Sequence, residues 1–346
     1  MTGRVRLIGL VALVGLLVFL SLESQPAASL AQGKHRVMLG VIDPDPAAFD
    51  RLTGHHHSLH LTFSFANEQL LENDAAAGRT SVITLSLTGL SSAAIARGAA
   101  DSKLVGQAQI VNDFGDPVWI RPMPEMNGHW SPWCAVTASG SSRGAAYSAK
   151  AFVRAFRRIA IIMRGGSVAA LDRALKRAGL PPLKKDALVD TGNSSGTENT
   201  STETTGTETG IQASGRVKLL WNPQGEGSPN VKGNAPRDYW PGAAFVDYVG
   251  DDLYEIKGKA SWATMDALYG AYRKPFVIAE WAPWGYDSPG FAQRMFAWAG
   301  SHSRTIGLIY FDRGWSGGGG TFLLKTKRRT LAVYRREARL AVFQTG

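Results

Sequence analysis

Short apolar runs rich in β-branched residues alternate with longer amphipathic stretches from residue 36 to the end of the chain. The apolar runs are typical of buried strands, and the amphipathic stretches are typical of helices that cover a sheet. Eight strands are predicted, at 36–42, 59–65, 82–87, 118–123, 217–221, 245–253, 276–279 and 305–311. The clearest helices between them are predicted at 104–114, 147–164, 264–273 and 289–299.

Eight buried strands that alternate with helices predict a parallel sheet, and eight is the number of strands that closes a barrel. The predicted fold class is therefore α/β, a single (β/α)8 TIM barrel over residues 35–346. A length of 346 residues with 44% hydrophobic and 19% charged residues is enough for one large core and excludes a disordered chain.

One stretch interrupts the alternation of strands and helices. Residues 191–215 are rich in Ser, Thr and Gly and contain almost no apolar side chain, so burial cannot offset the entropy of ordering them. We expect a disordered low-complexity segment within an insertion at 180–215, between helix four and strand five.

The first 31 residues read as a secretory signal peptide. Arg4 and Arg6 precede an apolar run at 7–22, and Ser29 and Ala31 supply the small residues of a cleavage site. We expect a secreted, extracellular protein that starts near Gln32, the alternative being an uncleaved membrane anchor. The single cysteine, Cys134, cannot close an internal disulfide.

Two glutamates follow apolar strands at the end of a parallel barrel where active sites lie. Glu125 comes after the fourth predicted strand and Glu280 after the seventh, each close to tryptophans. A pair of carboxyl groups is the minimum apparatus for glycoside hydrolysis, because one donates a proton and the other attacks the sugar or activates water. The alternative is that both are structural ion-pair partners, of Arg121 and Arg313.

Tryptophan faces suit sugars, because the C–H surface of a sugar is apolar while its hydroxyl groups remain free. Six of the ten tryptophans are predicted at this rim of the barrel and suggest an aromatic cleft for a chain-like sugar: Trp130, Trp133, Trp221, Trp281, Trp284 and Trp315. Packing of loop against loop is the alternative role for these side chains.

Three segments together carry a resemblance to a known family. Residues 121–133 (RPMPEMNGHWSPW) are similar to the acid/base motif of glycoside hydrolase family 26, chiefly secreted β-mannanases with (β/α)8 barrels. Residues 274–281 (KPFVIAEW) resemble that family's nucleophile strand, and residues 239–254 its sixth-strand segment. The similarity spans roughly residues 36–339 apart from the insertion.

The resemblance implies a retaining double displacement with Glu125 as general acid/base and Glu280 as nucleophile. It places Asn127 and Trp130 at the sugar under attack, and Tyr254 in a hydrogen bond to the nucleophile. Retention predicts a separation of about 5 to 5.5 Å between the two carboxyl groups. The other predicted substrate-binding residues are Trp133, Trp281, Trp284 and Trp315.

One position departs from the family pattern. The family usually has histidine directly before the acid/base glutamate, whereas this chain has Pro124, which offers neither an imidazole nor a backbone N–H. The expected function is a secreted retaining endo-β-glycanase that most resembles a β-1,4-mannanase. Other β-glycans (β-glucan, xylan or an exopolysaccharide) and a catalytically inactive polysaccharide-binding barrel are the alternatives.

Other polar clusters have plainer interpretations. His55, His56, His57 and His60 lack a carboxylate or thiolate at ligand spacing, so an exposed loop is favoured over a metal site. Solvated loop carboxylates are expected at Asp251, Asp252 and Asp312. Cys134 is expected to be a free, partly buried thiol. Neither a metal nor a cofactor is expected.

The net charge of +10 is concentrated near the C-terminus. Six of these charges come from the final predicted helix and its flanks, where seven basic residues face Glu337: Lys325, Lys327, Arg328, Arg329, Arg335, Arg336 and Arg339. We expect this helix outside the barrel, away from the substrate, so the charge does not indicate a nucleic-acid partner. A weak contact with an anionic cell surface is the most it suggests.

Overall fold

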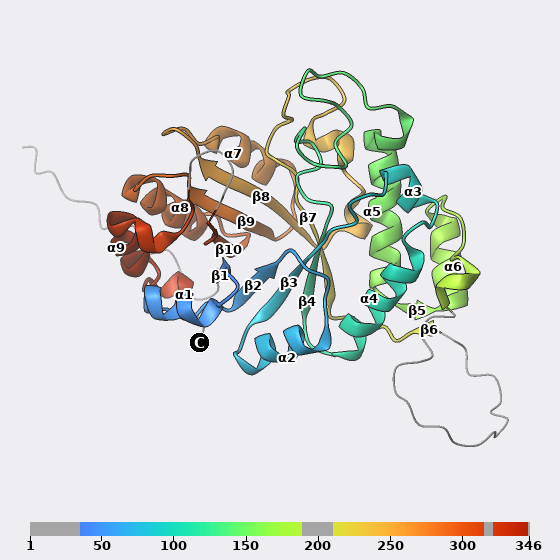
Figure 1. Ribbon diagram of the computed structural model, residues 1–346, viewed down its shortest axis with the longest axis horizontal. Helices are drawn as coiled ribbons and strands as arrows, with labels where there is room; N and C mark the ends of the chain where they lie inside the picture. Colours follow the sequence, from blue (N-terminus) through green and yellow to red (C-terminus); the bar gives the residue numbers. More distant parts are fainter. Residues whose placement is uncertain (1–34, 189–209, 315–320, 345–346) are drawn as a thin grey trace, which may run out of the picture. The chain divides into compact units, whose positions relative to one another are not determined.

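Eight parallel strands form a closed barrel in the computed structural model, which describes residues 35–188, 210–314 and 321–344 (Figure 1). All eight predicted strands are confirmed within a few residues. They are β1 (Met38–Ile42), β2 (Leu59–Thr62), β3 (Thr80–Leu85), β4 (Val118–Pro122), β7 (Val217–Trp221), β8 (Tyr248–Glu255), β9 (Phe276–Pro283) and β10 (Thr305–Phe311). Around the barrel each strand pairs in parallel with its neighbours in chain order, and β10 closes on β1.

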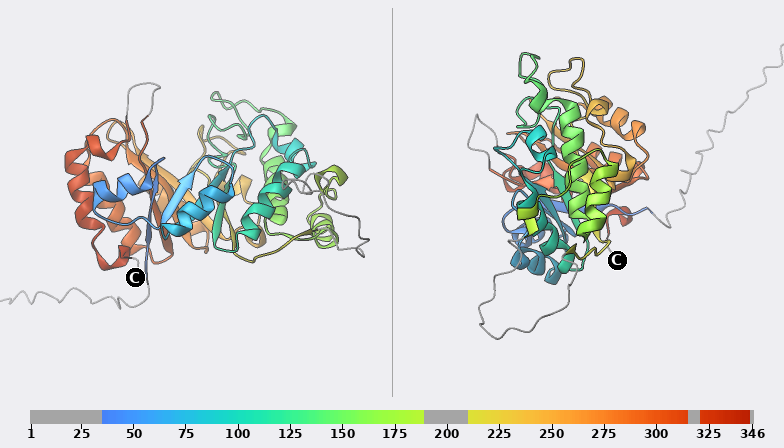
Figure 2. Two further views of the ribbon diagram at one scale, coloured as in Figure 1. Left: turned by 60° about the horizontal axis from the view of Figure 1, so that its bottom comes forward. Right: turned by 90° about the vertical axis from the view of Figure 1, so that its right-hand side faces the viewer.

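Nine α-helices lie in the described residues. They are α1 (Pro46–Thr53), α2 (Glu68–Ala76), α3 (Ser92–Ala96), α4 (Asp101–Asp113), α5 (Ala149–Met163), α6 (Val168–Arg177), α7 (Trp262–Ala271), α8 (Pro289–Ser301) and α9 (Arg328–Glu337). Side-chain caps fix several starts: Asn67 accepts from the backbone of α2, and Ser148 from that of α5. In Figures 1 and 2, α8 and α9 lie on the opposite side of the barrel from α4, α5 and α6.

The alternation of side chains along each strand divides the core into two layers. Inward-facing residues such as Leu61, Val82, Leu220 and Val277 fill the barrel, and Trp119 packs among them. Outward-facing residues form a larger layer between the strands and the helices. The barrel interior is therefore packed, and the polar residues of its inner face are displaced to the strand ends.

The connection after β7 departs from the regular alternation. Between residues 222 and 247, all of them described, the chain forms only two 3-10 turns, Pro236–Tyr239 and Ala243–Phe245, and no α-helix. Residues 224–230 instead form a loop that lies along the cleft at the C-terminal ends of the strands.

The predicted insertion is ordered at both of its ends. Residues 210–211 form strand β6, which pairs antiparallel with β5 (Gly166–Ser167), and the backbone N–H of Ser214 donates to Asn112 Oδ1 over 2.9 Å. The prediction of disorder is therefore wrong for 210–215, because Ile211 is buried in the core and backbone pairing with β5 adds to that contact. At the other end, Leu183 and Ala187 are buried. Residues 189–209 lie outside the described residues.

Two further predictions concern the ends of the chain. The predicted signal peptide, 1–31, lies outside the described residues. None of the helices within the described ranges is long and apolar enough to cross a membrane. The basic C-terminal helix, α9, packs against α8 and α1 on the outside of the barrel, as expected.

Candidate active site

A cleft of about 1210 Å³ opens at the C-terminal ends of the barrel strands. Both Glu125 and Glu280 line it, one from the segment after β4 and the other from β9. Its remaining walls come from β8, from the loop after β7 and from the segments that follow β2 and β10. The structure therefore brings together the two carboxyl groups that the sequence singled out.

The backbone around Glu125 is held in a conformation that non-glycine residues seldom adopt. Met123 and Glu125 have φ angles of 49° and 52°, in the left-handed region. The backbone N–H of Glu125 donates to the carbonyl of Asn222 over 2.8 Å and fixes the turn against the end of β7. Strain of this kind persists only where the surroundings enforce it, and it is concentrated at functional sites.

The side chain of Glu125 accepts two hydrogen bonds at the edge of the cleft. Trp130 Nε1 donates to its Oε2 over 2.5 Å, and Gln224 Nε2 donates to its Oε1. A Cβ atom at Gly128 would lie 2.5 Å from the Trp130 ring, so glycine is needed for the indole to fold back over this turn. Burial, reinforced by the charge of Glu280, raises the pKa of Glu125. A raised pKa suits a proton donor.

Glu280 faces the cleft because β9 contains one extra residue relative to both of its neighbours. Asp251 pairs with Ile278 but Asp252 pairs with Glu280, and the register with β10 shifts at the same place. Ala279 belongs to the inner layer of the barrel, and Glu280 lines the cleft, so two consecutive side chains lie on the inner side. A β-bulge re-aims side chains in this way.

Two donors hold the carboxylate of Glu280. Arg121 Nη1 donates to Oε1 over 2.7 Å, and Tyr254 Oη donates to Oε2 over 2.5 Å. Burial, together with the negative charge of Glu280, raises the pKa of Tyr254 well above its usual value, so the phenol keeps its proton. The hydrogen bond from Tyr254 is the contact that the family resemblance implied.

The arginine beneath the cleft also binds a second acid. Arg121 is fully buried, and its Nη2 donates to Asp252 Oδ2 over 2.5 Å. Asp251 and Asp252 are only 1% and 3% exposed and line the cleft, and Asp312 is 5% exposed, so the prediction of solvated loop carboxylates is wrong. Burial raises the pKa of both Asp251 and Asp252, and the negative charge of Glu125 raises both further.

Asn127 does not line the cleft, contrary to its predicted place at the sugar. It is fully buried, its Nδ2 donates to the carbonyls of Gln224 and Glu226, and its Oδ1 accepts from the backbone N–H of Gln224. Asn127 therefore acts through Gln224, which it positions against Glu125.

The predicted aromatic rim is smaller than expected. Trp130 (52% exposed) and the half-buried Trp284 line the cleft. Trp281 is fully buried against Tyr310 and Tyr334, because it follows Glu280 and points to the opposite face of β9. Trp221 and Trp133 are buried too: Trp221 packs on Trp240, and Trp133 (4% exposed) lines a smaller pocket that adjoins the cleft at Glu125. Trp315 lies outside the described residues.

Several cleft residues were not predicted from the sequence. Phe63 after β2 is 41% exposed, Ile256 after β8 is 44% exposed, and Phe311 and Phe322 line the same cleft. Their signal was weak, since a single aromatic residue at a strand end is equally typical of the core. Gln224 gave no signal at all, because its role depends on a loop shape that the sequence does not reveal.

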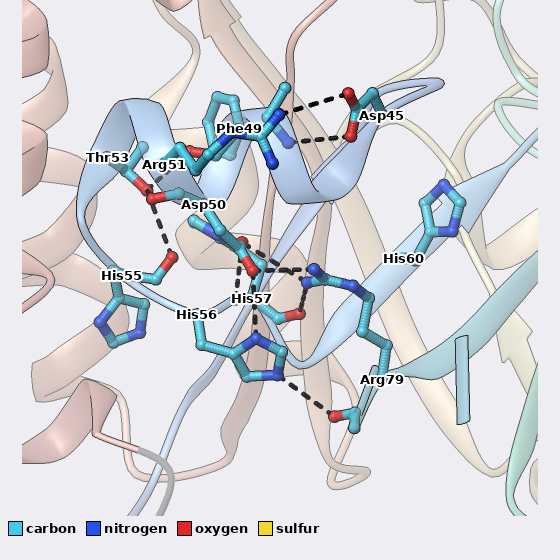
Figure 3. A network of polar contacts seen from close by, with 12 residues as sticks. Asp45, Phe49, Asp50, Arg51, Thr53, His55, His56, His57, His60 and Arg79 are labelled. Atoms are coloured by element: carbon cyan, nitrogen blue, oxygen red, sulfur yellow. Dashed lines mark hydrogen bonds and ion pairs between the residues drawn. The ribbon is translucent and has the colours of Figure 1, made fainter. Parts of the chain in front are cut away.

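The histidines near the opposite end of the barrel form a structural network (Figure 3). His57 is fully buried: its Nδ1 lies 2.7 Å from Asp50 Oδ1, and its Nε2 lies 2.8 Å from Tyr334 Oη. His60 is also buried and bonds to Asp74, so the prediction of an exposed loop is wrong at these two positions. In the described part of the chain, no group of three or more His, Cys, Asp or Glu residues could hold a metal ion. Cys134 is a free, buried thiol.

Comparison with solved structures supports this barrel. A mannanase from Bacillus subtilis, BCman, superposes with a TM-score of 0.52 at 15% sequence identity, over 86% of this chain and 85% of that one. A modular endo-β-1,4-mannanase from Cellulomonas fimi, described with the glycoside hydrolase family 26 mannanases, gives a TM-score of 0.54 at 14% identity, over 89% and 71% of the two chains.

Sequence comparison gives a relative that matches part of the chain. Endoglucanase H of Acetivibrio thermocellus is 24% identical over 199 residues, which make up 54% of this chain but only 16% of that protein. No known protein-family profile matches the chain. At these levels of identity the comparisons show a shared fold, and this chain has the (β/α)8 barrel of the two mannanases.

Proposed function

We propose that this protein is a retaining endo-β-glycanase with a β-1,4-mannan as its main substrate. The observation that carries the proposal is the shared cleft of Glu125 and Glu280, in which the first has a raised pKa and the second is held by a guanidinium and a phenol. Two carboxyl groups in different environments are what a retaining glycosidase needs.

In the proposed first step, protonated Glu125 donates its proton to the glycosidic oxygen while a carboxylate oxygen of Glu280 attacks the anomeric carbon. The bond to the leaving sugar breaks, and a covalent glycosyl ester forms on Glu280. In the second step, Glu125, now a carboxylate, takes a proton from water, and the water oxygen displaces Glu280 from the sugar. Glu125 ends protonated, Glu280 ends ionised, and the anomeric configuration is retained.

The cleft walls fit a neutral sugar chain. Exposed faces of Phe63 and Trp130, together with Trp284, offer apolar surfaces to sugar rings, and Gln224, Glu226 and Asn230 offer hydrogen-bond partners along the loop after β7. The similarity to the fold of the two mannanases favours mannan. Pro124 lines the cleft where the family has histidine, which keeps β-glucan, xylan and exopolysaccharide as the alternative substrates.

Reducing-sugar release from mannan, glucomannan, xylan, lichenan and alginate tests the proposal. Glu125→Gln and Glu280→Gln should each lower kcat by at least about 10³-fold, and Glu72→Gln, on the outer helix α2, should not. Azide should rescue Glu280→Ala as an α-glycosyl azide and Glu125→Ala as a β-glycosyl azide, which assigns the two roles. Activity that survives both glutamine substitutions would refute the site, and tight binding without hydrolysis of any polymer would identify a binding barrel.

Export is part of the proposal and rests on the sequence of residues 1–31. Expression of the full chain in a bacterial host, followed by N-terminal sequencing of the protein from the medium, should give a start near Gln32. A protein that stays with the membrane fraction and begins at its first residue would contradict cleavage.

A further inference from the structure

The helix α9 and the segment that follows it form a strongly basic surface. Residues 325–344 contain seven basic residues and one acid, Glu337. Glu337 pairs with Arg336, and Arg329 pairs with Asp287. The other exposed cations of this stretch have no carboxylate partner among the described residues: Lys325, Arg328, Arg335 and Arg339.

The end of this basic stretch lies at the N-terminal ends of the barrel strands. The backbone N–H of Val37, one residue before β1, donates to the carbonyl of Val342 over 2.8 Å. Arg36, which is also exposed, donates from Nη1 to the carbonyl of Gln344 over 2.7 Å. The cleft opens at the C-terminal ends of the same strands. The two surfaces therefore lie at opposite ends of the barrel.

An exposed apolar side chain lies among these arginines. Four large hydrophobic side chains are exposed in the described part of the chain, and three of them line the cleft: Phe63, Trp130 and Ile256. The fourth, Leu340, is 49% exposed and directly follows Arg339. A single exposed leucine is common on protein surfaces, but this one is surrounded by cations that lack carboxylate partners. We call Arg36, Arg335, Arg339 and Leu340 together the basic end face.

This combination of side chains fits the surface of an anionic bilayer. Arginine pairs with the phosphate groups of lipid heads, and each arginine near such a surface tightens binding about five-fold. An apolar side chain beside the arginines can enter the boundary between head groups and acyl chains. A soluble polyphosphate or a nucleic acid would pair with the arginines as well, but it would leave Leu340 in water. The exposed leucine therefore favours the bilayer.

We propose that the basic end face binds the surface of an anionic phospholipid bilayer, which leaves the cleft at the opposite end of the barrel facing away from the membrane. The proposal goes beyond the proposed function and does not depend on it, because none of the four residues lines the cleft. The contact is peripheral, and salt should weaken it, because charges in water are screened over about 10 Å at 0.1 M salt.

Co-sedimentation with lipid vesicles tests the proposal. The chain that starts at Gln32 is used, because the apolar run at 7–22 would itself bind lipid. It should sediment with vesicles of equal parts phosphatidylglycerol and phosphatidylcholine, and not with vesicles of phosphatidylcholine alone. An increase of NaCl from about 0.05 M to about 0.5 M should lower the partition coefficient at least about 10-fold.

A matched pair of double variants separates this face from the net charge of the protein. Arg335→Gln with Arg339→Gln should lower the partition coefficient about 25-fold. Arg173→Gln with Arg177→Gln removes the same charge at the same spacing from exposed positions of α6, on the opposite side of the barrel (Figures 1 and 2). This control should change the coefficient less than about 2-fold.

Further variants separate lipid binding from a structural role. Arg335 also donates from Nε and Nη2 to the carbonyl of Leu52. Arg335→Lys keeps the charge but not this fork, so it should bind like the wild type. Arg339→Gln alone should lower the partition coefficient about five-fold with an unchanged melting temperature. Leu340→Ala should lower it about 3-fold, and Leu340→Trp should raise it.

The orientation is tested with a fluorophore attached to an introduced cysteine, because the native Cys134 is buried. A fluorophore on Gln344→Cys, beside the basic end face, should be quenched by brominated lipid. The same fluorophore on Asn230→Cys, an exposed position of the cleft wall, should not be quenched. Quenching at Asn230→Cys alone would overturn the orientation.

The other outcomes are equally distinct. Equal sedimentation with the two kinds of vesicle, or equal losses in the α6 and α9 double variants, overturns the basic end face as a lipid site. Binding to soluble polyphosphate that Leu340→Ala leaves unchanged, without sedimentation on vesicles, overturns the bilayer in favour of a phosphate polymer. These measurements do not involve hydrolysis, so their failure leaves the proposed function intact.

Discussion

The indole nitrogen of Trp130 lies 2.5 Å from Oε2 of Glu125, while just over half of the surface of this tryptophan remains exposed in the cleft. One side chain thus offers a face to a sugar ring and a hydrogen bond to the proposed proton donor. The hydrogen bond favours the ionised carboxylate, so it lowers the pKa that burial and Glu280 raise.

Trp130→Phe should therefore move the alkaline limb of the pH profile. A general acid loses activity as the pH rises through its pKa, and removal of the indole donor raises the pKa of Glu125 further. We expect the alkaline limb of kcat/KM to shift to higher pH. Trp298→Phe breaks a similar 2.6 Å bond, to Asp266 on the outside of the barrel, and should leave the profile unchanged. A shift to lower pH in Trp130→Phe would contradict this role.

Tyr254→Phe removes one of the two donors to Glu280. Hydrogen bonds to charged groups contribute about 1.5 to 3 kcal/mol, so kcat should fall about 10- to 100-fold without loss of the fold. Kinetics with an activated aryl glycoside, together with thermal melting, would measure both effects. Tyr286→Phe, at an exposed turn where the hydroxyl accepts from Gly258, is the matched control. An unchanged kcat in Tyr254→Phe would show that the hydrogen bond from Tyr254 to Glu280 does not contribute to catalysis.

Glu280 and Trp281 show how far the sequence could predict this site. The sequence located β9 and its glutamate correctly, because an apolar run that ends in a carboxylate is a local signal. Strict alternation would place Ala279 and Glu280 on opposite faces, but the bulge places both inside and turns Trp281 outward. A bulge depends on pairing with β8 and β10, which are distant in sequence, so no local pattern predicted it.

Asn127 and His57 illustrate a second limit. Both occur in segments that chemistry singled out, but the partners that bury them come from residues about 100 and 280 positions away, Gln224 and Tyr334. Hydrogen-bond partners at such separations are fixed by the closed barrel and not by spacing. The sequence could therefore predict the fold, the two glutamates and the contact of Tyr254 with Glu280, but not that Asn127 is buried or that Gln224 and Asp252 line the cleft.

Arg121 should contribute to the free energy of unfolding as well as hold Glu280 in the site. Its guanidinium is fully buried between Asp252 and Glu280, so Arg121→Met would leave two acids without their cation. Breaking a buried pair from one side costs about 3 to 5 kcal/mol. Urea unfolding should show this loss, and Arg121→Met combined with Asp252→Asn should recover part of it. Arg164→Met, at a partly exposed pair with Asp247, should cost less than about 1 kcal/mol.

Substitutions of Trp281, in β9, and of Trp284, in the loop that follows, should separate an effect on stability from an effect on substrate binding. Trp281→Ala removes a fully buried ring, so it should cost about 3 to 5 kcal/mol of unfolding free energy. Trp284→Ala, at the cleft wall, should instead raise KM or the dissociation constant for an oligosaccharide with a smaller change in stability. A binding defect without destabilisation in Trp281→Ala would reverse the assignment.

His57 links the loop before β2 to the C-terminal helix and stays neutral in the folded protein. Burial lowers its pKa to about 4 despite its hydrogen bond with Asp50, and its two nitrogens are fully used, Nδ1 by Asp50 and Nε2 by Tyr334. The other titratable side chains near Asp50 are Arg79, the exposed His56 and the half-buried His55, whose pKa burial lowers (Figure 3). The Arg79 and His57 bonds lower the pKa of Asp50.

Acid should therefore destabilise the protein through His57. The unfolded chain binds a proton at this histidine below about pH 6.5 and the folded one only near pH 4, so the contribution of His57 to the free energy of unfolding should fall across that window by on the order of 3 kcal/mol. The buried carboxyl groups with raised pKa values, Glu125, Asp251, Asp252 and Asp312, act in the opposite direction, so the effect is measured as the difference between the wild type and a His57 variant. Asp50 is ionised in both states over most of this range and does not offset the loss. Urea unfolding at pH 7, 6, 5 and 4 would measure it. The difference in the free energy of unfolding between the wild type and His57→Gln should change by about this amount between pH 7 and pH 4, and the difference between the wild type and His56→Gln should stay constant. An equal slope in the wild type and His57→Gln would show that His57 is not the group that titrates.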